Sequence, residues 1–542
     1  MYTFSSKLKT LAFVLMVLGA LGIGYGFFTA PKTVEEAEQI IAAQHGHGGH
    51  GDAAHHEEAA APHHEGAEAH HEGAAAEHHE GAEAHEGHEA EAGAPPAGDA
   101  EVHNDFASTP NEEAATAPAD AEKATDTSAA DEVAADEASP TGDAAVAGQG
   151  EAHSEIAVAH EGHGAHADAS HDEHKEHAEH VLKQLKNKPW AAVYVAALFF
   201  MLISLGALAF YAIQNAAQAG WSPVLFRVME GISSYLIPGA IIVFILLALG
   251  VFHWHGLFIW MDEDVVAADH LIKAKSGYLN GPFFLIRAAI FMGGWIWYRQ
   301  YSRKQSLAQD EATDNVSYKR SFKGAATFLV FFIISESIMS WDWIMSVDPH
   351  WYSTLFGWYV FASFFVSGIT TIAMITLYLK SKGYLEYVNT SHIHDLAKFM
   401  FGISVFWTYL WFSQFMLIWY ADIPEEIVYF KMRIENYNLP FFGMVAMNFI
   451  LPILILLNTD FKRLTWIVVM AGIIILCGHY VDFFNMIMPA TVGDQWFIGV
   501  TEISAVLFFL GLFILVVFTT LTKAPLLAKR NPLIEESKHF QY

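Results

Sequence analysis

Apolar runs long enough to cross a lipid bilayer recur along most of the chain. About 20 apolar residues span the hydrocarbon core of a membrane. Ten runs reach this length, at about 8–28, 190–214, 229–252, 282–300, 322–346, 353–379, 394–420, 438–457, 464–488 and 499–522. Tryptophan and tyrosine stand at many of their ends, as in interfacial aromatic belts. The pattern predicts an all-α integral membrane protein with ten transmembrane helices, of which the first is retained and is not a signal peptide.

A long polar segment separates the first two runs. Residues 31–188 contain 36 of the 59 acidic residues but only 6 of the 29 lysines and arginines, and 22 of the 30 histidines lie between 45 and 180. The formal charge of -30 therefore belongs to this segment. With so few large apolar residues, it cannot bury enough surface to offset the entropy of its chain. We predict a mostly disordered insert, with a short helix at 171–187 that leads into the second span.

The histidines of the insert allow three interpretations. They could bind Zn, Cu or Ni loosely, they could buffer protons, or they could belong to a solvated spacer. The repeats have no fixed spacing that closes a tetrahedral metal site. The spacer interpretation is therefore favoured.

Basic residues in the short loops predict the orientation of the chain. With the amino terminus in the cytoplasm, the inner segments hold 17 Lys/Arg and the short outer loops hold four. Cytoplasmic loops are the ones enriched in lysine and arginine. Both termini are then cytoplasmic and the insert is periplasmic. The chain divides into a first transmembrane helix (1–30), the insert (31–188), a nine-helix membrane domain (189–522) and a cytoplasmic tail (523–542).

Composition excludes several classes of function. The single cysteine, Cys477, rules out a disulfide framework, a Cys-ligated iron–sulfur cluster and a covalently attached c-type haem. No basic face is present for nucleic acid. We therefore expect membrane lipid as a partner, no nucleic acid, and no redox metal bound by this chain.

Four ionisable residues inside the predicted spans suggest proton transfer. Such residues are costly in a bilayer and usually mark a pathway or a pair. Glu336 lies near the middle of the fifth span and Asp342 further along the same helix. His479 and Asp482 are three residues apart in the ninth span, so they lie on the same side of the helix. These four residues are the candidate proton path, and the alternatives are neutral packing residues or a structural pair.

A second group of residues suggests a quinone site on the outer side. Oxidation of a quinol releases two protons, so its site needs a histidine or carboxylate at each hydroxyl and aromatic walls for the ring. The candidates are His253, Arg287, Asp348, His350 and Gln414. A polar cap that docks a partner protein is an equal alternative for the outer residues.

Two long motifs resemble a known family. They are SWDWIMSVDPHWYST at 340–354, and FWTYLWFSQ at 406–414, which continues to IWYADIPEE at 418–426. Both are similar to the large membrane subunits of alternative complex III, a quinol:cytochrome c oxidoreductase, which belong to the NrfD/PsrC-like family with the membrane subunit of polysulfide reductase. The resemblance covers about 189–522. In length and extended first loop, the chain is more similar to the second quinone-binding subunit of that complex.

The resemblance implies an architecture and a set of partners. It implies ten helices, with helices two to five and six to nine forming two four-helix bundles. It implies a respiratory complex of the bacterial inner membrane whose haem and iron–sulfur centres lie on other subunits, with quinone or menaquinone as a possible ligand here. The partners would be a paralogous quinol-binding membrane subunit, an iron–sulfur subunit and multihaem c-type cytochromes. It places Asp342, Asp348, His350, Gln414 and the pair Glu425–Glu426 on motif positions.

Three functions remain open from the sequence. The first is a subunit of a quinol-oxidising complex that contributes a quinone site, a proton path or both, whether or not this subunit is itself catalytic. The second is a His-rich metal-ion transporter, although the spans lack the paired ligand spacing of a transport site. The third is a purely structural scaffold subunit of a respiratory complex.

Overall fold

The computed structural model describes residues 2–47 and 163–541 of the 542-residue chain. These residues form helices joined by short connections, with no strand among them. The first helices are α1 (Ser6–Thr29), α2 (Val34–His47), α3 (His163–Ala216), α4 (Phe226–Ile232), α5 (Leu236–Val251), α6 (Glu263–Ala268), α7 (His270–Lys275), α8 (Gly281–Glu311) and α9 (Val316–Trp343). They are followed by α10 (Phe356–Ser381), α11 (Thr390–Ala421), α12 (Pro424–Glu435), α13 (Asn438–Val445), α14 (Leu451–Leu456), α15 (Thr465–Val492), α16 (Val500–Leu521) and α17 (Ile534–Lys538).

The described residues contain nine helices that are long and apolar enough to cross a membrane. They confirm an all-α, multi-pass membrane protein. Each predicted run coincides largely with one helix or with consecutive helical segments, and only the run at 282–300, in α8, is not among the nine. Because α8 carries Arg287 within its apolar stretch, its mean hydropathy is reduced.

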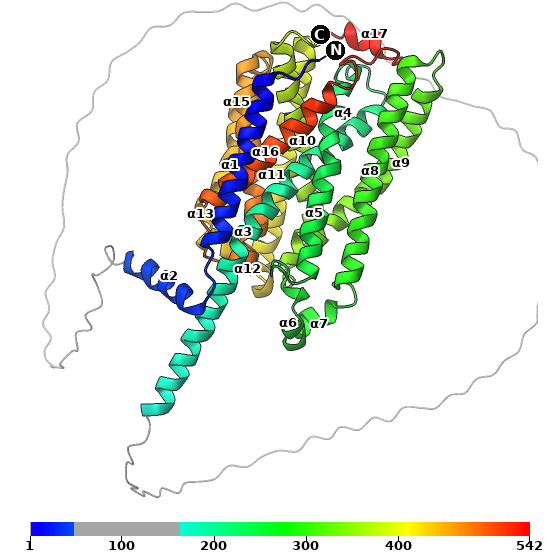
Figure 1. Ribbon diagram of the computed structural model, residues 1–542. Helices are drawn as coiled ribbons and strands as arrows, with labels where there is room; N and C mark the ends of the chain where they lie inside the picture. Colours follow the sequence, from blue (N-terminus) through cyan, green and yellow to red (C-terminus); the bar gives the residue numbers. More distant parts are fainter. Residues whose placement is uncertain (1, 48–162, 542) are drawn as a thin grey trace, which may run out of the picture. The chain divides into compact units, whose positions relative to one another are not determined.

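Two ends of the helix assembly can be distinguished. Both termini lie at one end, together with α17, and we call it the terminal end (Figure 1). Helices α6, α7 and α12 lie at the opposite end, which we call the distal end (Figure 1). Hydrogen bonds of the first and last residues hold the terminal end together: the Thr3 hydroxyl bonds to the Tyr384 hydroxyl, and Asn389 donates to the Phe540 carbonyl.

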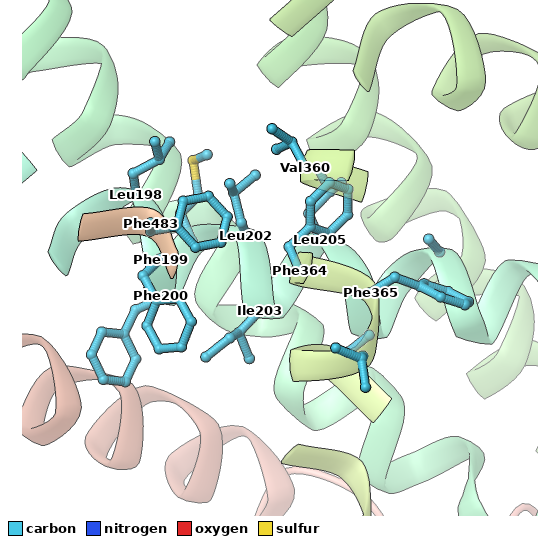
Figure 2. Packing of buried hydrophobic residues seen from close by; sticks show 14 of the residues in the cluster. Leu198, Phe199, Phe200, Leu202, Ile203, Leu205, Val360, Phe364, Phe365 and Phe483 are labelled. Carbon is cyan, nitrogen blue, oxygen red and sulfur yellow. The ribbon is translucent and has the colours of Figure 1, made fainter. Parts of the chain in front are cut away.

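Helices α3 and α10 form the centre of the assembly. In the most apolar part of α3, 94% of the residues are buried, against 17% in α1. The two central helices cross closely, because a Cβ at Gly206 would lie 2.5 Å from the Phe364 carbonyl oxygen and one at Gly368 would lie 2.6 Å from the Ala207 nitrogen. Figure 2 shows the apolar side chains packed around this crossing, including Phe483 from α15 beside Phe199.

Helix is present at both edges of the predicted insert. Helix α2 follows α1 after a short break, and α3 starts at His163, well before the second apolar run. The helix predicted at 171–187 is therefore confirmed as the first part of α3. Residues 48–162, where disorder was predicted, lie outside the described part of the chain.

Candidate functional site

A buried carboxylate, Asp482, stands where three helices meet. It lies on α15 with no exposed surface. Tyr359 of α10 donates its hydroxyl hydrogen to Oδ1, and the Trp407 Nε1 of α11 donates to Oδ2 at 2.8 Å. The predicted neighbour His479 lies one turn earlier and is also fully buried, with its Nδ1 3.6 Å from Asp482 Oδ2. The structure therefore brings the expected pair together and adds two donors from other helices.

His479 has one nitrogen engaged and one open. Its Nδ1 lies 2.9 Å from the Ser363 hydroxyl of α10, and its Nε2 has no hydrogen-bond partner among the described residues. The Trp407 ring packs edge-on against the imidazole, with centroids 5.4 Å apart. A carboxylate beside an imidazole with a free nitrogen is a combination that can hold a proton and pass it on.

Glu336 is a second buried carboxyl group, on α9. Its side chain is 1% exposed. Oε1 accepts a hydrogen bond from the Ser337 hydroxyl at 2.9 Å, whereas no described residue donates to Oε2. Buried polar atoms are normally paired, so this oxygen is an available position for a proton or a water molecule.

Asp342 has a different environment, because it forms an ion pair with Arg287. Arg287 Nε lies 2.6 Å from Oδ2 and its NH2 group lies 3.1 Å from Oδ1, which also accepts from the Tyr278 hydroxyl at 2.9 Å. The rings of Tyr278 and Phe283 flank the guanidinium, at 3.9 and 4.2 Å. A bidentate, charge-assisted pair of this kind is strong and geometrically fixed. The contacts favour a structural carboxylate over a mobile proton carrier.

The five residues proposed for a quinone site do not line one cavity. His253 borders two distal cavities of about 550 and 730 Å³, whereas Gln414 lines a much smaller cavity between α11 and α12. Arg287 is engaged by Asp342, as described above. His350 is exposed on the distal surface, and the half-buried Asp348 precedes it in the same connection.

His350 pairs with an acidic residue on the distal surface. Its Nε2 lies 2.5 Å from Asp269 Oδ2. The hydrogen bond from His350 is the main cause that lowers the pKa of Asp269, and the backbone N–H groups of Leu271 and Ile272 add to it. This pair joins the connection after α9 to the start of α7.

A buried ionic cluster at the terminal end was not predicted. Arg227 of α4 lies 2.9 Å from Glu230 and 2.5 Å from Asp310 of α8, and Arg303 also binds Glu230. Only the spacing of three residues between Arg227 and Glu230 was a local signal for this cluster. The partners on α8 are distant in sequence, so their pairing could not be inferred from one chain.

Comparisons with known proteins do not identify the chain. The sequence matches no model of a known protein family, and no curated protein matches it. The family resemblance therefore rests on the two motifs of the sequence.

Proposed function

We propose that this protein is a proton-handling membrane subunit of a quinol-oxidising respiratory complex, of the alternative complex III type. The observation that carries the proposal is the buried group of Asp482, His479, Tyr359 and Trp407, contributed by α10, α11 and α15. Ionisable groups are retained inside membrane spans mainly where they serve a pathway or a pair. Glu336, with one unpaired oxygen, is the second member of the proposed path.

The proposal assigns different tasks to the two buried aspartates. Asp342 receives three donors, two of them from a cation, so we assign it to holding α8 against α9. Asp482 accepts hydrogen bonds from a tyrosine and a tryptophan, which are neutral donors, and it has a histidine as its neighbour. A carboxylate without a permanent counter-charge can exchange a proton at lower cost than one in a bidentate ion pair.

The finer architecture belongs to the same proposal. Helix α8 would be a further span, the fourth along the chain, and would bring the number of spans to ten. The two four-helix bundles would consist of α3 to α9 and of α10 to α15, with α1 and α16 outside them. The excess of basic residues at the terminal end supports a cytoplasmic position for that end in a bacterial inner membrane. The distal end would then face the periplasm, where cytochromes and an iron–sulfur subunit would dock beside a paralogous membrane subunit.

A quinone site in this subunit is the second candidate function. The supporting observation is the distal cavity of about 730 Å³, a size suited to a ring-bearing ligand. Trp190, Trp254 and His255 line it, so both aromatic walls and an imidazole are available. His253 is the one residue of the predicted quinone group that lines this cavity.

Isolation of the complex tests the proposed function. An affinity tag on the carboxyl terminus would be used to purify the protein from its native membranes in mild detergent. The account predicts that haem-bearing and iron–sulfur polypeptides co-purify and that the preparation oxidises a quinol. A protein that purifies alone, stable and free of haem, would contradict it.

A further inference from the structure

A small cavity lies beside the Asp482 group, and several polar side chains are among the residues that line it. Its volume is about 10 Å³, close to the space that one water molecule needs. Side chains from five helices line it, and we use four of them: Tyr359 of α10, Gln414 of α11, Arg433 of α12 and Asn485 of α15. Aromatic rings form much of the remaining wall.

Several polar atoms of the lining residues have no hydrogen-bond partner in the part of the chain that the structure describes. They are Gln414 Oε1, Asn485 Oδ1 and the Trp411 Nε1. Gln414 and Asn485 are 4% and 1% exposed, so bulk water does not satisfy them. The amide of Asn485 is oriented by its own donors, because Nδ2 donates to the Pro440 carbonyl at 3.0 Å. Its Oδ1 is therefore an acceptor without a donor.

Arg433 adds buried donors to the same place. Its guanidinium donates to the backbone carbonyl oxygens of Asn485, Tyr429 and Met486, at 3.0, 2.7 and 3.4 Å. A guanidinium has five N–H groups, so two are left after these three bonds. The ring of Tyr429 covers one face of the group at 3.3 Å. Within residues 2–47 and 163–541, this arginine has no acidic partner, in contrast to Arg287.

We propose that the cavity is a binding site for one ordered water molecule, which extends the proton path from Asp482 toward the distal end. The water accepts from Arg433 or Trp411 and donates to Gln414 Oε1 and Asn485 Oδ1, so it makes about three hydrogen bonds, as buried waters do. Its part in proton transfer rests on the proposed function, whereas its presence does not.

Tyr359 connects the water to the carboxylate. It lines the cavity, and its hydroxyl donates to Asp482 Oδ1. A proton that reaches the water converts it to a hydronium ion, which has a third hydrogen. A tyrosine hydroxyl both donates and accepts, so this hydronium ion can donate to the Tyr359 oxygen while the tyrosine hydrogen moves to Asp482, and a neutral water stays in the site. One proton enters the phenol oxygen as another leaves it, and no net charge is created on Tyr359.

Aromatic side chains close the site on its distal side. Tyr429 stacks on Trp351, with centroids 3.9 Å apart and planes 16° from parallel. Because the rings exclude bulk solvent, exchange of the water requires them to move. The site would therefore hold its water between transfer events.

A map of the assembled complex at about 2 Å resolution tests for the water directly. We expect a density peak within hydrogen-bond distance of both Gln414 Oε1 and Asn485 Oδ1, at about 2.7–3.2 Å. An empty cavity in such a map would overturn the inference and leave the proposed role of Asp482 intact.

Variants of Gln414 test the function of the water. Gln414→Leu, which removes the acceptor, should abolish the peak and slow proton-coupled turnover about tenfold, and Gln414→Glu, which keeps an acceptor, should restore most of the rate. Ser413→Ala, on the next residue of α11, is the matched control and should behave as wild type. A lost peak with an unchanged rate would refute the relay. If Gln414→Leu fails to assemble, as judged by haem content, the relay is tested by the turnover rate of Gln414→Glu and by the wild-type map.

Discussion

At the scale of single residues, the partner of each buried charge determines what that charge can do. Asp342 and Asp482 are both fully buried aspartates in the distal halves of long helices, and from the sequence alone both had the same predicted role. Only the structure distinguishes them, because their partners come from other helices. Asp342 faces the guanidinium of Arg287, whereas Asp482 faces the phenol of Tyr359 and the indole of Trp407.

The ion pair of Asp342 predicts a large cost when its charge is removed. Asp342→Asn keeps the shape of the side chain but leaves Arg287 buried without a counter-charge, which typically costs about 3–5 kcal/mol. Tyr278→Phe removes one hydrogen bond from the same carboxylate and should cost about 1 kcal/mol. Thermal unfolding of the purified variants measures both. Equal, small losses would show that the pair is not a stabilising contact.

At the scale of helices, the hydropathy pattern predicted where most helices begin and end, but it did not predict where a helix is interrupted. The run at 394–420 corresponds to α11, Thr390–Ala421, and most other boundaries agree within several residues. The eighth run, in contrast, contains a π-helical turn at Ala446–Ile450. Pro452 lacks the N–H that the Asn448 carbonyl would bind in an α-helix, which accounts for the irregular turn. Hydropathy does not detect such a local change.

The third run is interrupted for a related reason. Helices α4 and α5 are separated by a short 3-10 turn at Ser233–Tyr235. The hydroxyl groups of Ser233 and Ser234 donate to the carbonyl oxygens of Glu230 and Gly231, at 3.0 and 2.6 Å. Serine side chains that bond to the backbone in this way compete with regular helix.

The close crossing of α3 and α10 predicts intolerance of any side chain at Gly368. A Cβ there would lie 2.6 Å from the Ala207 nitrogen and 2.7 Å from the Gly206 carbonyl carbon, so the two backbones would have to separate. Gly368→Ala should destabilise by about 1–3 kcal/mol. Gly402→Ala is the control, because that Cβ would meet nothing within 4 Å. A thermal midpoint unchanged in Gly368→Ala would contradict the tight crossing.

The loop after α5 should lose stability at mildly acidic pH because of His255. Its Nε2 donates to the Leu246 carbonyl at 2.9 Å, and burial lowers the pKa of the imidazole below its usual range. The unfolded segment, with a pKa near 6.5, then binds protons more readily than the folded one. Stability is complete above about pH 6.5 and decreases as the pH falls below it.

Hydrogen–deuterium exchange at residues 252–258 measures this effect. After correction for the intrinsic rate, protection should decrease between pH 7.5 and 5.5 in the wild type. The variant His255→Gln can still donate to Leu246 but does not titrate, so its protection should be independent of pH. A wild-type segment with constant protection would show that the histidine does not control this loop.

At the scale of the whole molecule, the tail connects segments that are far apart in sequence. Ser537 is fully buried: its hydroxyl donates to the Trp221 carbonyl at 2.6 Å and accepts from the Val224 N–H at 3.2 Å. The Lys529 N–H donates to Asp310, a member of the ionic cluster. The sequence predicted only a cytoplasmic tail, since these contacts join it to residues that are distant in sequence and lie on segments without a distinctive pattern.

Loss of the Ser537 hydroxyl should release the tail. Ser537→Ala removes two buried hydrogen bonds, at about 1 kcal/mol each. We expect faster trypsin cleavage at Lys529 and Arg530, with little change in the melting of the helices. Ser381→Ala, at the end of α10, serves as a surface control. Cleavage no faster than in the control would mean that other contacts hold the tail.

The central claim is that Asp482 carries protons for a redox complex, and proton translocation by the reconstituted complex tests it most directly. Asp482→Asn would be compared with the wild type and with Asp460→Asn, a control in the connection between α14 and α15. The account predicts that Asp482→Asn assembles with its full complement of haem but translocates protons at least about tenfold more slowly, while Asp460→Asn matches the wild type. An Asp482→Asn complex that translocates protons at the wild-type rate would contradict it.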